Sequence, residues 1–499
     1  MGMAVQREPA RGPARIAARP VAIFGALVAV AAIFYSFHLG RDPLGASEAY
    51  SAYAAARPSL GAIIHIPIAD DPGKQLLYYI VLHYWTSIFG GREAPLRSLS
   101  VICGLGGLAM LFALGRDLFD DAAGTAGAAM WAFNPLAVVF AFRARMYTML
   151  IVLALAHLYA FRRTRERTSP GWILVCALTG AAVIYTHLGG AAILAAEGAI
   201  LLRDFVHGRR SVAPWIALGG AALLFAPYLP IALAQSRVLI AGHWLDWIGP
   251  AHHYSTAAKL AVACGAAALA LWMIFGPRIE SGADEPFRFC ILWIGLPILA
   301  FAAGSIVVRP MFQLRYVSPG LAMLSVLAAG LLALAGARVR NLAVAAVTAT
   351  MLVAALAVRP VIQPWGAVAR MIESANEPAQ PIFFESGFVS SGAGPNVPNQ
   401  GFPRGYYSVP FNYYFDGPNP RLTVAPYDRD AARTAIEGAA TRAGGAWLIT
   451  WMDDADARAE LPDPAEFTST VRIRGERMML LRIVPAGARA SAPPPSIDH

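Results

Sequence analysis

The sequence predicts an all-α polytopic membrane bundle of about eleven transmembrane helices, followed by a small C-terminal α/β domain outside the membrane. The 499 residues are 57% hydrophobic and only 14% charged. This composition excludes a soluble globular protein, because most of the chain must be solvated by lipid. Apolar stretches long enough to cross about 30 Å of hydrocarbon also recur from residue 20 to residue 358.

Basic residues between these stretches define the predicted topology. Arginines cluster in the N-terminal tail 1–19, in the loops 162–167 and 203–210, and at Arg338 and Arg340. Lys and Arg beside membrane segments mark the cytoplasmic side, so we expect these four places to share one face. The net charge of +9 is then explained by the arginines that set the membrane topology, and nucleic acid is not an expected partner.

The first apolar run, 20–39, is predicted to be an uncleaved span. It is too long for the apolar region of a signal peptide, and Phe34, Tyr35 and Phe37 lie where small cleavage-site residues belong. The remaining predicted spans are 96–115, 122–141, 145–161, 171–186, 188–202, 213–233, 257–276, 287–307, 316–335 and 341–358.

The apolar run 75–89 is not counted as a span. It holds about 15 residues where about 20 are needed, and its tyrosines and tryptophan suit a membrane interface. Counting residues 75–89 as a span would also place the loops 162–167 and 203–210 on the side of the membrane opposite the basic N-terminus. We therefore predict a helix along the outer surface of the plasma membrane, with the N-terminus in the cytoplasm.

After residue 358 the long apolar runs stop and the chain alternates short helix and strand patterns, as in a small α/β unit. This predicted extracytoplasmic domain covers 359–488, and the tail 489–499 is predicted to be disordered. The predicted strands are 381–384, 422–425, 447–450, 470–473 and 478–484, and the predicted helices are 364–376 and 428–443.

The long first outer loop, 40–95, contains the candidate catalytic residues Glu48, Asp42 and Asp71. A carboxylate just outside a membrane span can act as a general base toward a hydroxyl, or hold a divalent cation. The alternative is that these acids are solvated loop charges. Small and aromatic residues at helical spacing around Glu48 predict a short interfacial helix with this carboxylate in its first turn, where the helix dipole favours it.

Basic, aromatic and histidine side chains on the same predicted face are candidates for substrate binding, because guanidinium groups bind phosphate with two hydrogen bonds. For the arginines before the span 316–335 the alternative is headgroup anchoring, and for the histidine it is a satisfied helix end. Glu197, within an apolar span, is a further functional candidate. The substrate-binding set is Lys74, Arg143, Arg145, Tyr147, His187, Arg309, Arg315 and Tyr316.

Five segments carry a family resemblance: ASEAYSAYAAAR, DPGKQLLYYIVLHYWTSIFGGREAPLRSLSVICGLGGLAMLFALGRDLF, FAFRARMYTMLIVLALAHLYAF, YTHLGGAAILAAE and RPMFQLRYVSPGLAML. Their order and spacing resemble the membrane glycosyltransferases of the GT-C class. The resembling group includes the dolichyl-phosphate-mannose protein mannosyltransferases and the bacterial lipid A aminoarabinose transferases. The likeness covers about residues 20 to 340, and it implies a GT-C-like bundle whose first outer loop contains helices lying on the membrane.

The resemblance implies an inverting transfer of sugar from a polyprenyl-phosphate-linked donor to a lipid, glycan or protein acceptor on the outer face, with an acidic general base. Two positions depart from the family pattern. The usual Asp-Glu pair is Ser47-Glu48 here, and Arg143 stands where the family often has an acid. These losses weaken the case for a bound divalent cation, since hard cations prefer carboxylates.

Two other functions remain open from the sequence. One is a lipid or sugar transporter or flippase, against which stand the few intramembrane charges, the absence of an internal repeat and the large outer domain. The other is a non-catalytic, glycosyltransferase-like assembly subunit, with which the two missing acids are consistent.

Overall fold

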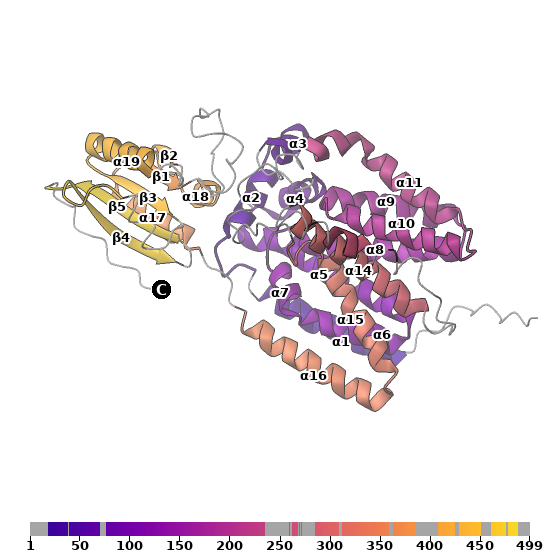
Figure 1. Ribbon diagram of the computed structural model, residues 1–499. Helices are drawn as coiled ribbons and strands as arrows, with labels where there is room; N and C mark the ends of the chain where they lie inside the picture. Colours follow the sequence, from indigo (N-terminus) through magenta and orange to yellow (C-terminus); the bar gives the residue numbers. More distant parts are fainter. Residues whose placement is uncertain are drawn as a thin grey trace, which may run out of the picture.

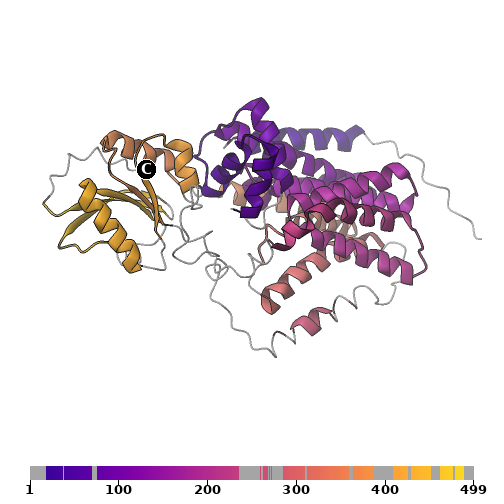
Figure 2. The ribbon, with the colours of Figure 1, turned by 90° about the horizontal axis from the view of Figure 1, so that it is seen from above.

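The chain folds as a helical bundle followed by a smaller domain built on a five-stranded sheet (Figures 1 and 2). The computed structural model describes residues 18–37, 39–69, 76–234, 259, 262–267, 269, 271, 285–308, 312–358, 363–385, 408–424, 429–450, 461–475 and 478–487.

The helices of the bundle follow the predicted apolar runs. The predicted span 257–276 lies largely outside the described residues. The helices are α1 (Ala18–Ser36), α5 (Glu93–Leu118), α6 (Asp121–Ala132), α7 (Pro135–Ala141), α8 (Tyr147–Glu166), α9 (Pro170–Thr186), α10 (Gly190–Val206), α11 (Ala213–Phe225), the 3-10 turn η1 (Ala226–Tyr228), α14 (Glu285–Val307), α15 (Ser318–Ala333) and α16 (Ala337–Leu356).

Four of the described helices are long and apolar enough to cross a membrane: α5, α11 with its continuation to Ala234, α14 and α16. The pair α6 and α7 makes a fifth if it counts as one span. The apolar parts of α1, α9 and α15 are shorter. A mostly helical protein with several apolar helices is therefore confirmed, whereas the predicted number of eleven spans is supported only in part.

The predicted span 122–141 is not one continuous helix. Asn134 accepts a hydrogen bond from the Leu136 amide at 2.9 Å and caps a new helix, whose first residue is Pro135. Proline has no amide hydrogen and its ring clashes with a preceding helical carbonyl, so α6 ends before it. The two helices meet at a bend of 68°. The predicted span 122–141 is therefore a bent pair of helices, which together are apolar enough to count as one broken span.

Glycines allow the apolar helices to pack with their backbones in contact. A Cβ added to Gly115 of α5 would lie 2.6 Å from the Cα of Gly124 of α6. A Cβ on Gly127 of α6 would lie 2.9 Å from a methyl carbon of Val326 on α15. Lipid tails are as apolar as leucine, so close packing through small residues, rather than hydrophobicity, holds such helices together.

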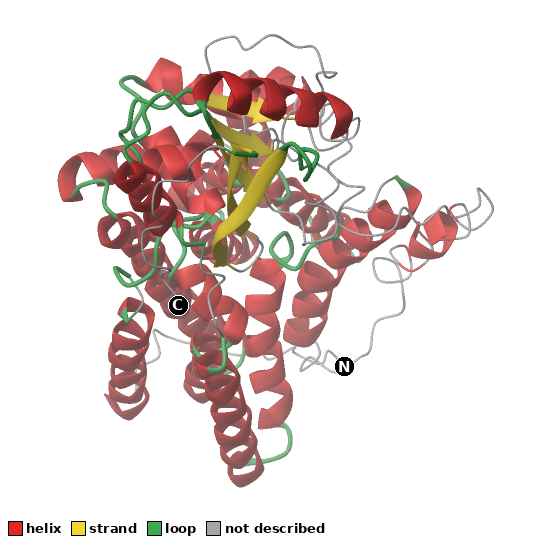
Figure 3. Cartoon of the chain, turned by 90° about the vertical axis from the view of Figure 1, so that its left-hand side faces the viewer, coloured by secondary structure: helices red, strands yellow, loops and turns green. Residues whose placement is uncertain are grey.

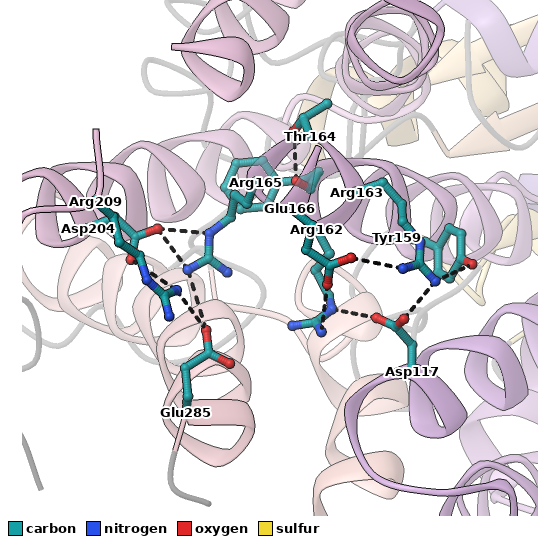
Figure 4. Close-up of polar contacts among 11 residues, drawn as sticks. Asp117, Tyr159, Arg162, Arg163, Thr164, Arg165, Glu166, Asp204, Arg209 and Glu285 are labelled. Atoms are coloured by element: carbon teal, nitrogen blue, oxygen red, sulfur yellow. Dashed lines mark hydrogen bonds and ion pairs between the residues drawn. The ribbon is translucent and has the colours of Figure 1, made fainter. Parts of the chain in front are cut away.

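One end of the bundle gathers the arginine-rich segments (Figure 4). Asp117, near the end of α5, binds Arg162 Nε at 2.8 Å and Arg163 Nη2 at 2.7 Å. Arg165 binds Asp204, near the end of α10, at 2.7 Å. The loops 162–167 and 203–210 therefore share a face, as the charge pattern predicts.

The starts of α1 and α16 adjoin this same end. Phe24, near the start of α1, stacks on Phe112 of α5 with ring centroids 4.5 Å apart, so the chain enters α1 close to Asp117. Arg340, near the start of α16, binds Asp120 at 3.3 Å. We call this end, marked by Asp117 and Asp120, the arginine face.

The opposite end carries three short helices of the first outer loop: α2 (Ala46–Ala55), α3 (Leu60–Ala69) and α4 (Leu76–Phe89). Trp85 of α4 donates to the carbonyl of Pro95 at 3.0 Å, at the start of α5. His83 of α4 lies 2.7 Å from the carbonyl of Ala55, at the end of α2. Helix α4, which is apolar but shorter than a full span, therefore lies beside the end of α2 and the start of α5, and its place along the membrane surface stays a prediction.

The C-terminal domain has a five-stranded sheet with strand order β2-β1-β3-β5-β4. Strand β1 pairs in parallel with β2 and β3, whereas β5 runs antiparallel to β3 and β4. All five strands overlap the predicted ones. Their bounds are Ile382–Glu385 for β1, Arg421–Val424 for β2, Ala446–Thr450 for β3, Phe467–Gly475 for β4 and Met478–Pro485 for β5.

Helices cover both faces of this sheet (Figure 3). Successive strand residues point to opposite faces, so Phe383 and Phe384 lie in two different apolar clusters. Phe384 packs with α17 (Trp365–Ala375) and α18 (Ser408–Tyr414), and Phe383 packs with α19 (Arg429–Ala443). Helices α17 and α19 were predicted from the sequence, whereas α18 was not.

Candidate functional site

The end of the bundle opposite the arginine face is organised around a buried ion pair. Glu48 lies in the first turn of α2, as predicted, and Arg97 lies one turn into α5. Arg97 Nε donates to Glu48 Oε1 at 2.8 Å and Nη2 donates to Oε2 at 3.1 Å. The two side chains are only 6% and 4% exposed. An arginine so placed binds a carboxylate with two parallel hydrogen bonds.

Glu48 has no acceptor position left over. Besides Arg97, Oε1 accepts from the Ala144 amide at 2.9 Å and Oε2 accepts from the Gly45 amide at 3.1 Å. In the Gly45 contact, the carboxylate at the third helical position accepts from the amide of the N-cap residue, which caps the start of α2. The four contacts occupy the lone pairs of both oxygens. The carboxylate predicted to be the general base thus holds α2, α5 and the turn before α8 together.

Arg97 also holds the backbone that leads into α2. Its Nη1 donates to the carbonyls of Leu39 and Asp42 at 3.1 and 2.8 Å, and its Nη2 donates to the carbonyl of Pro43 at 3.1 Å. With the two bonds to Glu48, each of the five N–H groups of the guanidinium has a partner. We call residues 39–48 the site loop.

Arg145 belongs to the same framework. Its Nη1 donates to the carbonyl of Ser47 at 2.7 Å and to the hydroxyl of Ser51 at 3.2 Å, both on α2. The residue is 4% exposed. The Ser47 hydroxyl stands where the family pair has its aspartate, and the backbone carbonyl of Ser47 accepts the arginine. Arg145 therefore fixes the turn before α8 against α2.

Arg143 differs from its neighbour. It is half-buried in the turn between α7 and α8. Within the described part of the chain its guanidinium takes part in no hydrogen bond or ion pair. A half-buried cation without a counter-charge is an electrostatic cost unless an anion comes to it.

Arg315 is the second such cation at this end. It lies in the turn before α15, 6.0 Å from the ring of Tyr147 and 5.3 Å from the ring of Tyr316. Its Nε is buried and has no hydrogen-bond partner among the described residues. Tyr316 in turn lies 5.0 Å from the ring of His187, which caps α9. The turns before α8, α10 and α15 thus converge, as the predicted substrate-binding set requires.

His187 has a local role as well. Its Nδ1 accepts a hydrogen bond from the Gly189 amide at 3.0 Å, and the residue is 6% exposed. This arrangement matches the helix-end interpretation, and the ring also contacts that of Tyr316 in a tilted orientation.

Three predicted site residues, Asp71, Lys74 and Arg309, lie outside the described residues. Asp42 is described and half-buried in the site loop. Among the described side chains, no group of three or more His, Cys, Asp or Glu gathers in a way that could hold a metal ion.

The residue that sequence reasoning missed is Arg97. An arginine inside the first turns of an otherwise apolar span is costly unless it is paired, and that signal was present in the sequence.

A second polar cluster lies inside the bundle. His157 of α8 and Glu197 of α10 are both fully buried, with Nε2 and Oε2 2.7 Å apart. Trp293 of α14 donates to Glu197 Oε1 at 3.0 Å. His157 Nδ1 lies 3.0 Å from the carbonyl of Cys176 on α9, so this nitrogen carries the hydrogen. The predicted candidate Glu197 therefore faces neighbouring helices and ties them together.

Comparisons with known proteins agree with this architecture. The family model of dolichyl-phosphate-mannose-protein mannosyltransferases matches residues 72–233. A search of curated protein sequences gives no match. The matched segment contains Arg97, Arg143, Arg145, Tyr147 and His187, although not Glu48.

Solved structures show the same fold. ArnT from Cupriavidus metallidurans in the apo state is 15% identical over 93% of this chain and 98% of its own, with a TM-score of 0.55. ArnT from the same organism bound to undecaprenyl phosphate has the same identity and coverage and a TM-score of 0.51. The oligosaccharyltransferase of Archaeoglobus fulgidus in complex with Zn and sulfate is 12% identical over 88% of this chain and 69% of its own, with a TM-score of 0.50. The chain is thus similar to the dolichyl-phosphate-mannose-protein mannosyltransferases over residues 72–233, and it shares the fold of ArnT.

Proposed function

We propose that the chain transfers a sugar from a polyprenyl-phosphate carrier to an acceptor at the end of the bundle that holds the site loop. The observation that carries the proposal is the pair of half-buried guanidinium groups, Arg143 and Arg315, which have no counter-charge among the described residues. Phosphate is a good ligand for such groups, and ArnT, with the same fold, is known in complex with undecaprenyl phosphate.

In the proposed reaction the acceptor is a lipid, glycan or protein that carries a hydroxyl. A base removes the hydroxyl proton as the oxygen attacks the anomeric carbon. The bond from that carbon to the phosphate oxygen breaks, and polyprenyl phosphate leaves with the negative charge. Attack from the face opposite the phosphate inverts the anomeric carbon. Arg143 and Arg315 stabilise the leaving phosphate because its charge grows during the step.

The surroundings of Glu48 change the proposed assignment of the base. Its oxygens are occupied by Arg97 and two backbone amides, so it can accept a proton only by losing one of these bonds. We therefore propose that Glu48 positions the site loop and that Asp42 or Asp71 removes the proton. A divalent cation, if one takes part, would use these same two carboxylates.

The proposed membrane orientation puts the arginine face in the cytoplasm and the site loop and C-terminal domain outside. It is supported by three arginine-rich segments and the start of α1, which lie together at one end. A reporter fused at Ser169 or Arg210 should give a cytoplasmic signal, and one fused at Pro395 an external signal. A cytoplasmic signal at Pro395 would contradict the orientation and the proposed site of reaction.

The donor site is tested with the purified protein in proteoliposomes. The double variant Arg143→Ala, Arg315→Ala should bind undecaprenyl phosphate at least tenfold more weakly, since hydrogen bonds to charged groups contribute about 1.5–3 kcal/mol each. Arg338→Ala is the matched control, because this exposed arginine lies on the arginine face. Equal affinity in the double variant and the control would contradict the donor site.

Transfer itself is tested with radiolabelled undecaprenyl-phosphate sugars and membranes that supply acceptors. We expect label in a lipid, glycan or protein fraction, and its loss in either Asp42→Asn or Asp71→Asn. A non-catalytic assembly subunit is the second candidate, because Glu48 has no free acceptor position. That candidate predicts undecaprenyl phosphate binding without transfer for every sugar tried.

A further inference from the structure

Helix α18 connects the C-terminal domain to the bundle, and its two sides face different apolar cores (Figure 1). Phe411 of α18 and Phe415, which directly follows the helix, are buried in the core of the C-terminal domain. Val409 and Tyr413, four residues apart, pack into the apolar core of the bundle. Residues four apart lie on the same side of a helix, so α18 is built to join the two parts.

Two tyrosines of α18 bind the bundle beside the site loop. Tyr413 donates to the carbonyl of Gly91, before α5, at 2.8 Å. The hydroxyl of Tyr414 accepts from the Leu44 amide at 2.7 Å and donates to Glu93 Oε1 at 3.0 Å. Of these three contacts, only the one between the Leu44 amide and Tyr414 reaches the site loop.

The Leu44 amide sits between the parts of the loop that Arg97 and Glu48 hold. Its neighbour Pro43 gives its carbonyl to Arg97, and its other neighbour Gly45 gives its amide to Glu48. Leu44 itself is fully buried. The loop is thus held from the bundle by the ion pair and from the C-terminal domain by one phenol.

The phenol of Tyr414 can serve this purpose because it stays neutral. Burial raises the pKa of Tyr414 above its ordinary value, and the nearby Glu93 carboxylate raises it further. A protonated phenol donates its hydrogen to the carboxylate while its oxygen accepts from the Leu44 amide, so both contacts hold across the physiological pH range.

We propose that Tyr414 is a positioning residue through which the C-terminal domain holds the site loop in the shape needed for transfer. The connection runs from Tyr414 to Leu44, through the loop to Glu48, and from Glu48 to the Ala144 amide beside Arg143. The inference rests on the proposed function for its effect on transfer, but its effect on the loop can be measured independently of activity.

The test compares Tyr414→Phe with the matched control Tyr413→Phe in the full-length protein. Each variant removes one hydroxyl from the same helix and keeps the aromatic ring. We expect Tyr414→Phe to speed amide hydrogen exchange in residues 39–48 and 142–147 by about tenfold, the factor equivalent to one hydrogen bond. Tyr413→Phe should stay within about twofold of the unaltered protein in both segments.

Transfer of a radiolabelled sugar from undecaprenyl phosphate should also fall about tenfold in Tyr414→Phe, with the thermal midpoint of the bundle unchanged. Glu93→Gln, which still offers an oxygen to the phenol, should retain transfer close to the original rate. Faster exchange combined with unchanged transfer would overturn the positioning role.

The exchange data separate this proposal from the proposed function. If the unaltered protein transfers no sugar, the proposed function fails, and exchange in residues 39–48 still decides whether Tyr414 holds the loop. Unchanged exchange in Tyr414→Phe would overturn the proposal. Equal acceleration by Tyr413→Phe would also overturn it, because general docking of α18 would then explain the result.

Discussion

Replacing Glu48 by Gln is expected to lower the stability of the protein by about 3–5 kcal/mol, the usual effect of removing one partner from a buried ion pair. Arg97 would keep its charge in a site where it is almost inaccessible to water. The amide NH₂ of glutamine would also face two of the four donors that surround the carboxylate, because each oxygen accepts from two of them. These two donors would then lose their acceptor.

Changes to Arg97, the other partner of the buried ion pair, should also lower the stability of the protein. Arg97→Lys keeps the charge, but an ammonium has three donors where the guanidinium uses five. We expect a loss of about 1–3 kcal/mol, from two missing hydrogen bonds. The double variant Glu48→Gln, Arg97→Met should be more stable than Glu48→Gln alone, because it removes the unpaired charge.

The assay is thermal unfolding in detergent, followed by a buried tryptophan, together with sugar transfer measured on the same samples. A structural Glu48 predicts that stability and transfer fall together and that transfer recovers in part at low temperature. If Glu48→Gln unfolds at the original temperature while transfer is lost, the carboxylate acts in the reaction and our assignment of a positioning role is wrong.

Two further changes test the interior of the bundle. Gly124→Ala should lower the free energy of unfolding by about 1–3 kcal/mol, because the new Cβ would lie 2.5 Å from the Phe112 carbonyl oxygen. Gly219→Ala, which has open space around it, is the control and should leave the unfolding midpoint unchanged. His157→Phe removes the partner of Glu197, so it should lower the free energy of unfolding by about 1–3 kcal/mol and lower the unfolding midpoint with it. An unchanged midpoint in either destabilising variant would contradict the packing described for it.

Charge and apolar periodicity predicted the parts of the fold that depend on local sequence. The arginines at 162–167 and 203–210 could be placed together because topogenic charge is read along the chain. The strands around Phe383 and Leu448 could be recognised from short apolar runs between turns. Asn134 and Pro135 show the limit of an apolarity count, since the run continues through a helix break that only the capping residues reveal.

The candidate site was predicted less well, because it depends on contacts between distant residues. Glu48 was found, but its partner Arg97 is 49 positions away. The Leu44 amide and the Tyr414 hydroxyl are 370 positions apart. Spacing along one sequence carries no information about such pairs, so a carboxylate bound by four donors looks the same as a free one.

The buried pair of His157 and Glu197 has a consequence for how the chain enters the membrane. Neither α8 nor α10 is among the described helices that are long and apolar enough to cross alone. A carboxylate or imidazole at mid-helix adds to the cost of insertion. We therefore expect α8 and α10 to be retained at the translocation machinery until they pair, while α9 and α11 supply the apolar surface between and beside them. Truncations that end before α10 should leave α8 poorly inserted, which glycosylation mapping would detect.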